Sequence, residues 1–155
     1  MKTEQEIEKL FTKYRNALIL KLNRKPLTTD IINRECKNLF QAKFAGCYAQ
    51  NDSFPIKNGK YYIINTDTKE GPGEHWISVI LTPTRVYVYD SFARSPKKIV
   101  PLLMKRFKNK KVIYDTKDKE QTAVKNGKQT VICGHSSIAF LKIAHELGIR
   151  AAMKI

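Results

Sequence analysis

Long apolar runs are missing from this sequence. No stretch of about eighteen consecutive apolar residues occurs, which is the length that a membrane-spanning helix requires. The first residues, MKTEQEIEKLF, are too acidic and too amphipathic for a secretory signal peptide. These two absences lead us to expect a soluble intracellular protein with no membrane partner.

Cysteine is scarce as well. The three cysteines are Cys36, Cys47 and Cys133, and an odd number argues against a framework of disulfides. Their spacing matches no pattern of metal ligands. We therefore expect reduced thiols, no metal site and no required cofactor.

Acidic residues are also few. The chain has 29 Lys and Arg against 14 Asp and Glu, which gives a formal net charge of +15. Such a charge favours polyanions, above all nucleic acid, in binding that weakens as salt rises. However, no zinc-finger, RRM or KH signature accompanies it, and a lysine-rich coding bias that decorates solvated surfaces explains it equally well. Both interpretations stay open, so charge alone assigns no function.

What is present predicts one folded domain over residues 1–155. The chain is 42% apolar and shows no repeat, low-complexity segment or linker. Helical and strand patterns both occur, so we expect an α+β fold with a central mixed or antiparallel sheet flanked by helices. Its parts are an N-terminal helical part (1–45), a sheet region (60–116) and a C-terminal helix (133–147).

Local patterns set the expected elements. A capping box at Thr3 opens a helix that runs to about Leu22, and Thr28 or Thr29 caps a second helix. Strands rich in β-branched and aromatic residues are expected at 60–67, 75–81, 85–92 and 110–116. The segment SPKKIVPLLMKRF reads as helical, with Pro101 able to break it, and Gly148 is expected to end the last helix.

His75 and Asp90 stand at the ends of two neighbouring predicted strands. If Thr82 pairs with Arg85 across a two-residue turn, then Ile77 lies opposite Asp90, and His75 and Asp90 share a face. The diagonal gap between such residues is about 7 to 8 Å, which imidazole and carboxylate can bridge. A carboxylate that binds one ring nitrogen fixes the tautomer and leaves the other nitrogen as a base.

Cys133 is the candidate nucleophile for that base. It follows a long loop and starts a predicted helix, where free amides, the helix dipole and a nearby imidazolium stabilise a thiolate. His135 points to nearly the opposite side of that helix, and His145 lies about 18 Å along its axis. Only His75 is therefore expected to serve Cys133. Taken singly, each of these residues is more often structural, and their joint placement carries the hypothesis.

These residues also carry a family resemblance. The sequence has HW at the start of one strand, an acid followed by an aromatic-containing turn, a loop that contains glutamine, and CG at the start of a helix. This order resembles the cysteine proteases of the adenovirus maturation type (adenain) and the related SUMO-deconjugating proteases. The similar region covers roughly residues 44–147, including FAGCYAQNDSFPIKNGKYYIINTDTKEGPGEHWISVILTPTRVYVYDSF.

The resemblance implies a role for each matching residue. Cys133 would be the nucleophile at the start of a core helix, His75 the general base and Asp90 the residue that orients His75. The oxyanion hole would combine the Cys133 backbone amide with a glutamine side chain. Gln121 is favoured for that glutamine if VKNGK is an insertion, and Gln129 is the alternative.

Two further residues match the family, namely Trp76 and Gly134, which the resemblance places at the substrate. The plain interpretation of Trp76 as a core aromatic is equally compatible with its position.

Two departures from the family pattern also matter. The acid is aspartate, as in the SUMO proteases, whereas adenain has glutamate. No cysteine lies between Asp90 and Cys133 that could attach the peptide cofactor of adenain.

The implied function is a cysteine endopeptidase that processes viral capsid and core precursor proteins during virion maturation, cutting after glycine-containing motifs. Such a protein would act in the virion and in the viral factory of the host cytoplasm. DNA would be a non-specific partner and activator, and the lysine-rich composition suggests an AT-rich viral or virophage genome. Two rival functions remain open: an isopeptidase that removes a ubiquitin-like protein or SUMO, and a non-enzymatic nucleic-acid-binding domain.

Overall fold

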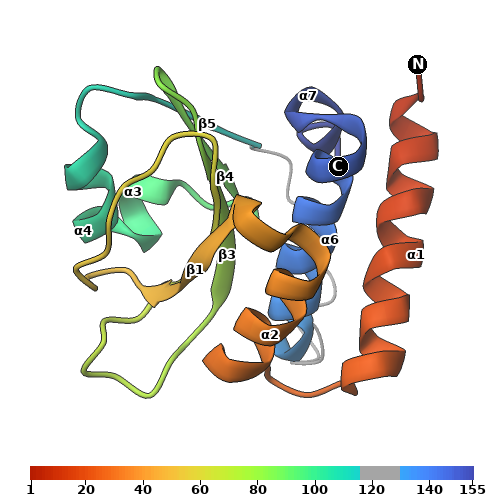
Figure 1. The fold of residues 1–155 in the computed structure, drawn as a ribbon, viewed down its shortest axis with the longest axis horizontal. Helices are drawn as coiled ribbons and strands as arrows, with labels where there is room; N and C mark the ends of the chain where they lie inside the picture. Colours follow the sequence, from red (N-terminus) through yellow and green to blue (C-terminus); the bar gives the residue numbers. More distant parts are fainter. Residues whose placement is uncertain (116–129) are drawn as a thin grey trace.

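A five-stranded mixed β-sheet lies between two groups of helices (Figure 1). The computed structural model describes residues 1–115 and 130–155. The strands lie in the sheet in their order along the chain. They are β1 (Phe44–Ala49), β2 (Tyr61–Asn65), β3 (Trp76–Leu81), β4 (Arg85–Tyr89) and β5 (Lys111–Tyr114). This arrangement confirms the α+β class and the mixed sheet flanked by helices.

The two outer strand pairs of the sheet are parallel and the two inner pairs are antiparallel. In the β3–β4 hairpin, Ser78 pairs with Tyr89 and Leu81 with Val86. The Thr82 N–H donates to the Arg85 carbonyl at 2.9 Å. The predicted two-residue turn is therefore confirmed, and the register continues to place Ile77 across from Asp90.

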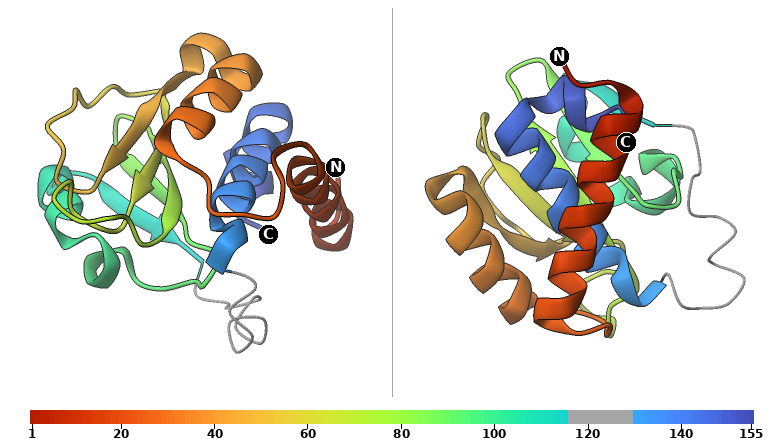
Figure 2. Two further views of the ribbon diagram at one scale, coloured as in Figure 1. Left: turned by 90° about the horizontal axis from the view of Figure 1, so that it is seen from below. Right: turned by 90° about the vertical axis from the view of Figure 1, so that its right-hand side faces the viewer.

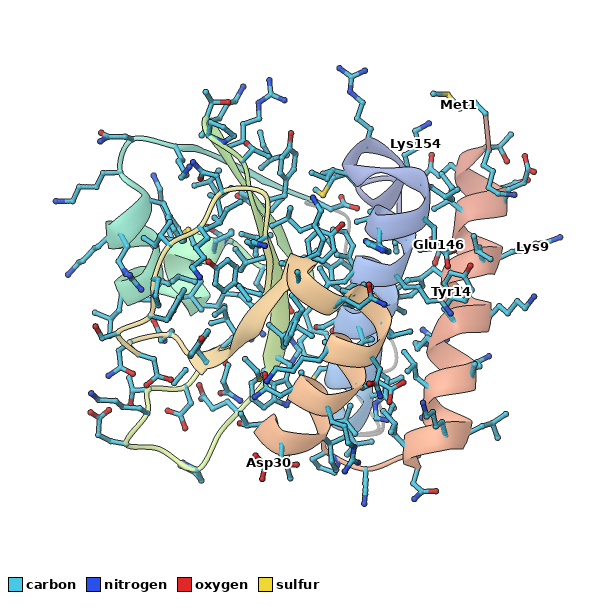
Figure 3. All side chains as sticks on the ribbon, in the orientation of Figure 1. Met1, Lys9, Tyr14, Asp30, Glu146 and Lys154 are labelled. Carbon is cyan, nitrogen blue, oxygen red and sulfur yellow. The ribbon has the colours of Figure 1, made fainter. Side chains whose placement is uncertain are left out.

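Four helices cover one face of the sheet: α1 (Glu4–Leu22), α2 (Thr29–Phe40), α6 (Cys133–Leu147) and α7 (Ile149–Ala152). The views in Figure 2 agree that α6 lies between the sheet and α1. Of the 15 residues of α6, 11 are buried, and a helix that is buried on nearly all sides is expected to be apolar around its circumference. Near the far end of α6, the Tyr14 hydroxyl of α1 donates to Glu146 (Figure 3).

The starts of the first two helices follow the predicted capping chemistry. Thr3 and Glu6 form the reciprocal capping box, and the Thr28 side chain accepts the Ile31 N–H at 3.3 Å. Six residues join the two helices. This short connection crosses the beginning of α6, because Leu27 packs directly against Gly134 there.

The opposite face of the sheet is covered by the crossover between β4 and β5. It contains α3 (Pro96–Ile99), α4 (Pro101–Met104) and the 3₁₀ turn η2 (Lys105–Phe107). The break at Pro101 confirms the expected effect of proline, which opens the second helix at its first position. Residues of both layers form an apolar core that includes Tyr62, Ile77, Val88, Val100 and Leu103.

The structure differs from the sequence prediction in several elements. Strand β1 and the preceding turn η1 (Gln41–Lys43) were not predicted, and β1 lies outside the expected sheet region 60–116. The turn η3 (Thr130–Ile132) and α7 were not predicted either. Strand β4 ends at Tyr89 instead of continuing to residue 92, because the chain turns sharply around Asp90. No helix in 1–115 or 130–155 is both long and apolar enough to cross a membrane.

Candidate active site

His75 and Asp90 meet at one end of the β3–β4 hairpin. His75 directly precedes β3, Asp90 directly follows β4, and His75 Nε2 lies 2.6 Å from Asp90 Oδ1. Both side chains are buried, with exposures of 6% and 1%. The hydrogen bond inferred from the hairpin register is therefore present, and it leaves Nδ1 as the second ring nitrogen of His75.

Cys133 is the first residue of α6, and β3 holds that end of the helix in place. The Ser78 hydroxyl donates to the Ser137 carbonyl at 2.7 Å, and the Ser137 hydroxyl donates to the Trp76 carbonyl at 3.1 Å. The Trp76 backbone N–H donates to Cys133 Sγ at 3.4 Å. These bonds fix the sulfur beside the residue that precedes Trp76, which is His75.

The electrostatics of the site favour charged His75 and Asp90. Burial opposes the imidazolium, but hydrogen bonds and charges from Asp90 and Cys133 outweigh it and raise the pKa of His75 to about 9. Burial likewise opposes the Asp90 carboxylate, yet hydrogen bonds and charge from His75 and Arg94 lower its pKa to about 2. At neutral pH the site therefore holds an imidazolium between a carboxylate and the Cys133 sulfur.

The other two cysteines have a different environment. Burial, with smaller contributions from Cys47 and Glu35, raises the pKa of Cys36 well above its usual range. Burial also raises the pKa of Cys47 to about 12. Both residues therefore remain neutral thiols near neutral pH.

A cleft of about 660 Å³ opens beside Cys133. It is bounded by the connection between α1 and α2, by the ends of β1 and β2, and by the loop that leads to β3. The Trp76 side chain lines this cleft, and its Nε1 donates to the Leu27 carbonyl at 3.0 Å. The half-buried Trp76 thus borders the cleft and also packs against the core, so both interpretations of this residue agree with its position.

Gly134 is buried against Leu27 and does not line the cleft. A Cβ atom at position 134 would lie 3.0 Å from Leu27 Cδ1 and 3.2 Å from Leu27 Cβ. Glycine therefore lets the α1–α2 connection pass close to Cys133. Packing explains this residue without any contact with substrate.

The remaining histidines lie away from Cys133, as expected. His135 is fully buried, and its Nε2 bonds the Asn23 carbonyl at 2.9 Å. His145 lies towards the other end of α6, where its Nδ1 lies 3.2 Å from the Tyr61 hydroxyl. Neither histidine joins the site.

Gln121 and Gln129, the two candidates for the oxyanion hole, lie outside the described residues. The described chain also contains no group of three or more His, Cys, Asp or Glu side chains arranged to hold a metal ion. The candidate site therefore rests on Cys133, His75 and Asp90 together with the backbone of Trp76.

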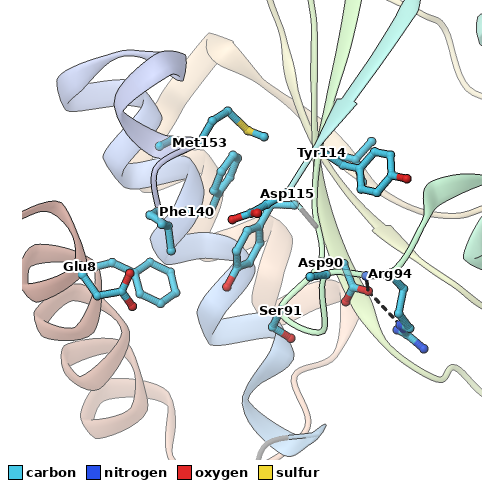
Figure 4. Close-up of a pocket in the computed structure, with 14 residues that line it drawn as sticks. Glu8, Asp90, Ser91, Arg94, Tyr114, Asp115, Phe140 and Met153 are labelled. Atoms are coloured by element: carbon cyan, nitrogen blue, oxygen red, sulfur yellow. Dashed lines mark hydrogen bonds and ion pairs between the residues drawn. The ribbon is translucent and has the colours of Figure 1, made fainter. Parts of the chain in front are cut away.

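Sequence reasoning missed two residues that contact this group. The Phe92 ring stacks on His75, with centroids 4.8 Å apart. Arg94 Nε donates to Asp90 Oδ2 at 2.8 Å, as Figure 4 shows. The segment DSFAR contained a usable signal, because an arginine four residues after an aspartate in a turn can reach back to the carboxylate.

The described residues define an α+β protein in which a cysteine, a histidine and an aspartate assemble at the start of a buried helix. Comparisons of the chain with protein-family models, with curated proteins and with solved structures find no match.

Proposed function

We propose that this protein is a cysteine peptidase in which Cys133 is the nucleophile, His75 the acid and base, and Asp90 the residue that orients His75. The observation that carries this proposal is the contact of His75 with both Asp90 and Cys133. A carboxylate, an imidazole and a sulfur in this order are the components of a thiol-based acyl transfer.

The proposed reaction has two steps. The Cys133 sulfur attacks the carbonyl carbon of the scissile bond, and the His75 imidazolium gives its proton to the departing amine, which leaves a thioester. Neutral His75 then takes a proton from water, and the hydroxide adds to the thioester carbonyl. Collapse of this adduct releases the acid product, and the sulfur is restored beside a protonated His75.

Negative charge develops on the carbonyl oxygen in both steps. The start of α6 suits this charge, because helix N-termini present backbone amides and a positive dipole end. In our proposal the Cys133 N–H is one donor of the oxyanion hole and the Gln121 side chain is the second.

The finer fold assignment, to the type shared by adenain and the SUMO-deconjugating proteases, is part of the same proposal. It is supported by the chain order of histidine, aspartate and cysteine, and by their positions before one strand, after the next and at the start of a core helix. The function we favour is processing of capsid and core precursors in the virion and viral factory, after glycine-containing motifs. Trp76 lines the cleft beside Cys133, and in our proposal its ring limits the residue before the scissile bond to a small side chain.

The test is hydrolysis of the structural proteins encoded with this chain, and of peptides with glycine before the scissile bond. Cys133→Ala should abolish cleavage, whereas the matched variant Cys47→Ala, which removes another thiol that lines the cleft, should retain it. Ubiquitin or SUMO with a C-terminal electrophile should react poorly.

Rapid covalent capture of such a probe, with no cleavage of a co-encoded protein, would establish the deconjugating isopeptidase instead. If the protein neither cleaves a co-encoded protein nor reacts with the probe, the proposed peptidase function is wrong.

A further inference from the structure

Each oxygen of the Asp90 carboxylate has its own partners. Oδ1 lies 2.6 Å from His75 Nε2 and accepts the Phe92 N–H at 3.2 Å. Oδ2 accepts both Nε and the backbone N–H of Arg94, at 2.8 and 3.1 Å. Arg94 thus supplies two donors to the oxygen that does not face His75, and these bonds fix the rotation of the carboxylate.

Phe92 links the two cationic partners of Asp90. Its ring stacks on His75 at an interplanar angle of 18°, and the Arg94 guanidinium lies over the same ring at 5.2 Å from its centroid. His75, Asp90, Arg94 and Phe92 therefore form a closed ring of contacts. The turn behind it is held by the Ala93 N–H, which donates to the Asp90 carbonyl at 2.8 Å, with Ala93 at a φ of 52°.

Two other acidic side chains line a cavity that Asp90 also lines. A small cavity of about 30 Å³ is lined by Asp90 and Arg94 together with Glu8 of α1 and, at the end of β5, Tyr114 and Asp115 (Figure 4). Burial of the Asp90 carboxylate favours its protonation, because a charge is poorly solvated in the protein interior. The Arg94 guanidinium opposes this effect of burial through its ion pair with Asp90 Oδ2.

We propose that Arg94 is a positioning residue: it holds Oδ2 and keeps Asp90 ionised, so that Oδ1 stays directed at His75. The catalytic consequence rests on the proposed peptidase function, whereas the electrostatic role does not. A merely structural ion pair with a side chain that is 41% exposed would change stability little and leave the titration of the site unchanged.

The experiment compares Arg94→Met and Arg94→Lys with the control Arg150→Met, which removes an equal charge from an exposed position on α7. The titration midpoint of the Asp90 carboxyl is followed by carbon NMR, and that of His75 by its ring signals. Arg94→Met should raise the Asp90 midpoint by about one pH unit or more, because it loses a cation and a hydrogen-bond donor. Arg94→Lys should show a smaller rise, and Arg150→Met none.

Activity provides the second readout. In Arg94→Met, kcat on a cleaved peptide should fall on the order of tenfold while KM stays nearly constant, because the imidazole loses its fixed orientation. If Arg94→Met does not fold, Arg94→Lys decides the question. An Asp90 midpoint equal to that of the unmodified protein would overturn the proposal, whether or not the protein cleaves peptides. A shifted midpoint in a protein without peptidase activity would uphold the electrostatic role of Arg94 and reject the proposed function.

Discussion

At the scale of single residues, Cys133 and Cys47 form a natural comparison. Both thiols line the same cleft, and their exposures are nearly equal at 5% and 6%. Access to solvent therefore does not distinguish them. Their surroundings do, because Cys133 lies beside the imidazole of His75 and accepts the Trp76 N–H, whereas burial raises the pKa of Cys47 to about 12.

Iodoacetamide near neutral pH should consequently alkylate Cys133 at least about tenfold faster than Cys36 or Cys47, since the thiolate is the reactive form. Peptide mapping by mass spectrometry over time gives the three rates. His75→Ala should slow the reaction at Cys133 and leave the other two unchanged. Equal rates at all three cysteines in the native protein would contradict the assignment of the nucleophile.

The raised pKa of His75 predicts how activity and stability depend on pH. Its folded value of about 9 lies above the ordinary value of 6.5, so the site stabilises the fold fully below about 6.5 and loses this contribution as pH rises through 9. Peptidase activity should fall over the same upper range, because neutral His75 has no proton for the leaving amine. Urea unfolding between pH 6 and 10 measures the stability change, and His75→Gln should remove it.

The lowered pKa of Asp90 predicts the opposite dependence of stability on pH. Its folded pKa of about 2 lies below the ordinary value of 3.8, so its contribution is complete above about 3.8 and is lost as pH falls through 2. Asp90→Asn should keep the fold but reduce turnover strongly, because an amide that donates to His75 selects the wrong tautomer. Full activity of Asp90→Asn would show that the carboxylate has no role in the chemistry.

At the scale of elements, the α1–α2 connection contacts the start of α6 next to Cys133. Replacing an exposed glycine inside a helix with alanine usually raises the free energy of unfolding of the protein by about 1 kcal/mol. Gly134→Ala should instead lower the free energy of unfolding by about 1 to 3 kcal/mol, because the new methyl group meets Leu27 at 3.0 Å.

Chemical denaturation measures this difference. Ser136→Ala serves as the control in the same turn, since its buried hydroxyl has no hydrogen-bond partner among the described residues. Adding Leu27→Val to Gly134→Ala should recover part of the loss. A stabilised Gly134→Ala variant would mean that Leu27 moves aside without cost.

Elements with strong local signals were predictable from the sequence. Capping residues located α1 and α2, and alternation with turn residues located β2, β3 and β4 and even the register that joins His75 to Asp90. Strand β1 was missed because its residues FAGCYA include small residues and a glycine, and its pairing with β2 depends on long-range contacts. The stacking of Phe92 on His75 was missed for a related reason, since it depends on the turn of the folded chain. The bond from Arg94 to Asp90 was missed although their spacing in the sequence indicated it.

At the scale of the whole molecule, the net charge of +15 predicts interaction with polyanions. Duplex DNA of any sequence should bind, and the affinity should fall steeply between 50 and 200 mM salt, by about tenfold or more, as counterion release requires. Fluorescence anisotropy with two unrelated duplexes measures this dependence. An increase of the proposed peptidase activity on addition of DNA would support the proposed action on a packaged genome. If no DNA binds at 50 mM salt, the lysines are ordinary solvated surface residues with no role in DNA binding.

The position of α6 between the sheet and α1 also governs how the site opens. Amide protons in the middle of such an enclosed helix exchange with deuterium only through opening of the surrounding layers, so we expect residues 138–144 to be among the slowest-exchanging of the described chain. Partial fraying at the termini therefore leaves the sulfur, the imidazole and the carboxylate together. We expect loss of the site to coincide with cooperative unfolding, and, if the proposed activity is present, covalent labelling of Cys133 by an activity-based probe would count the native molecules in a sample.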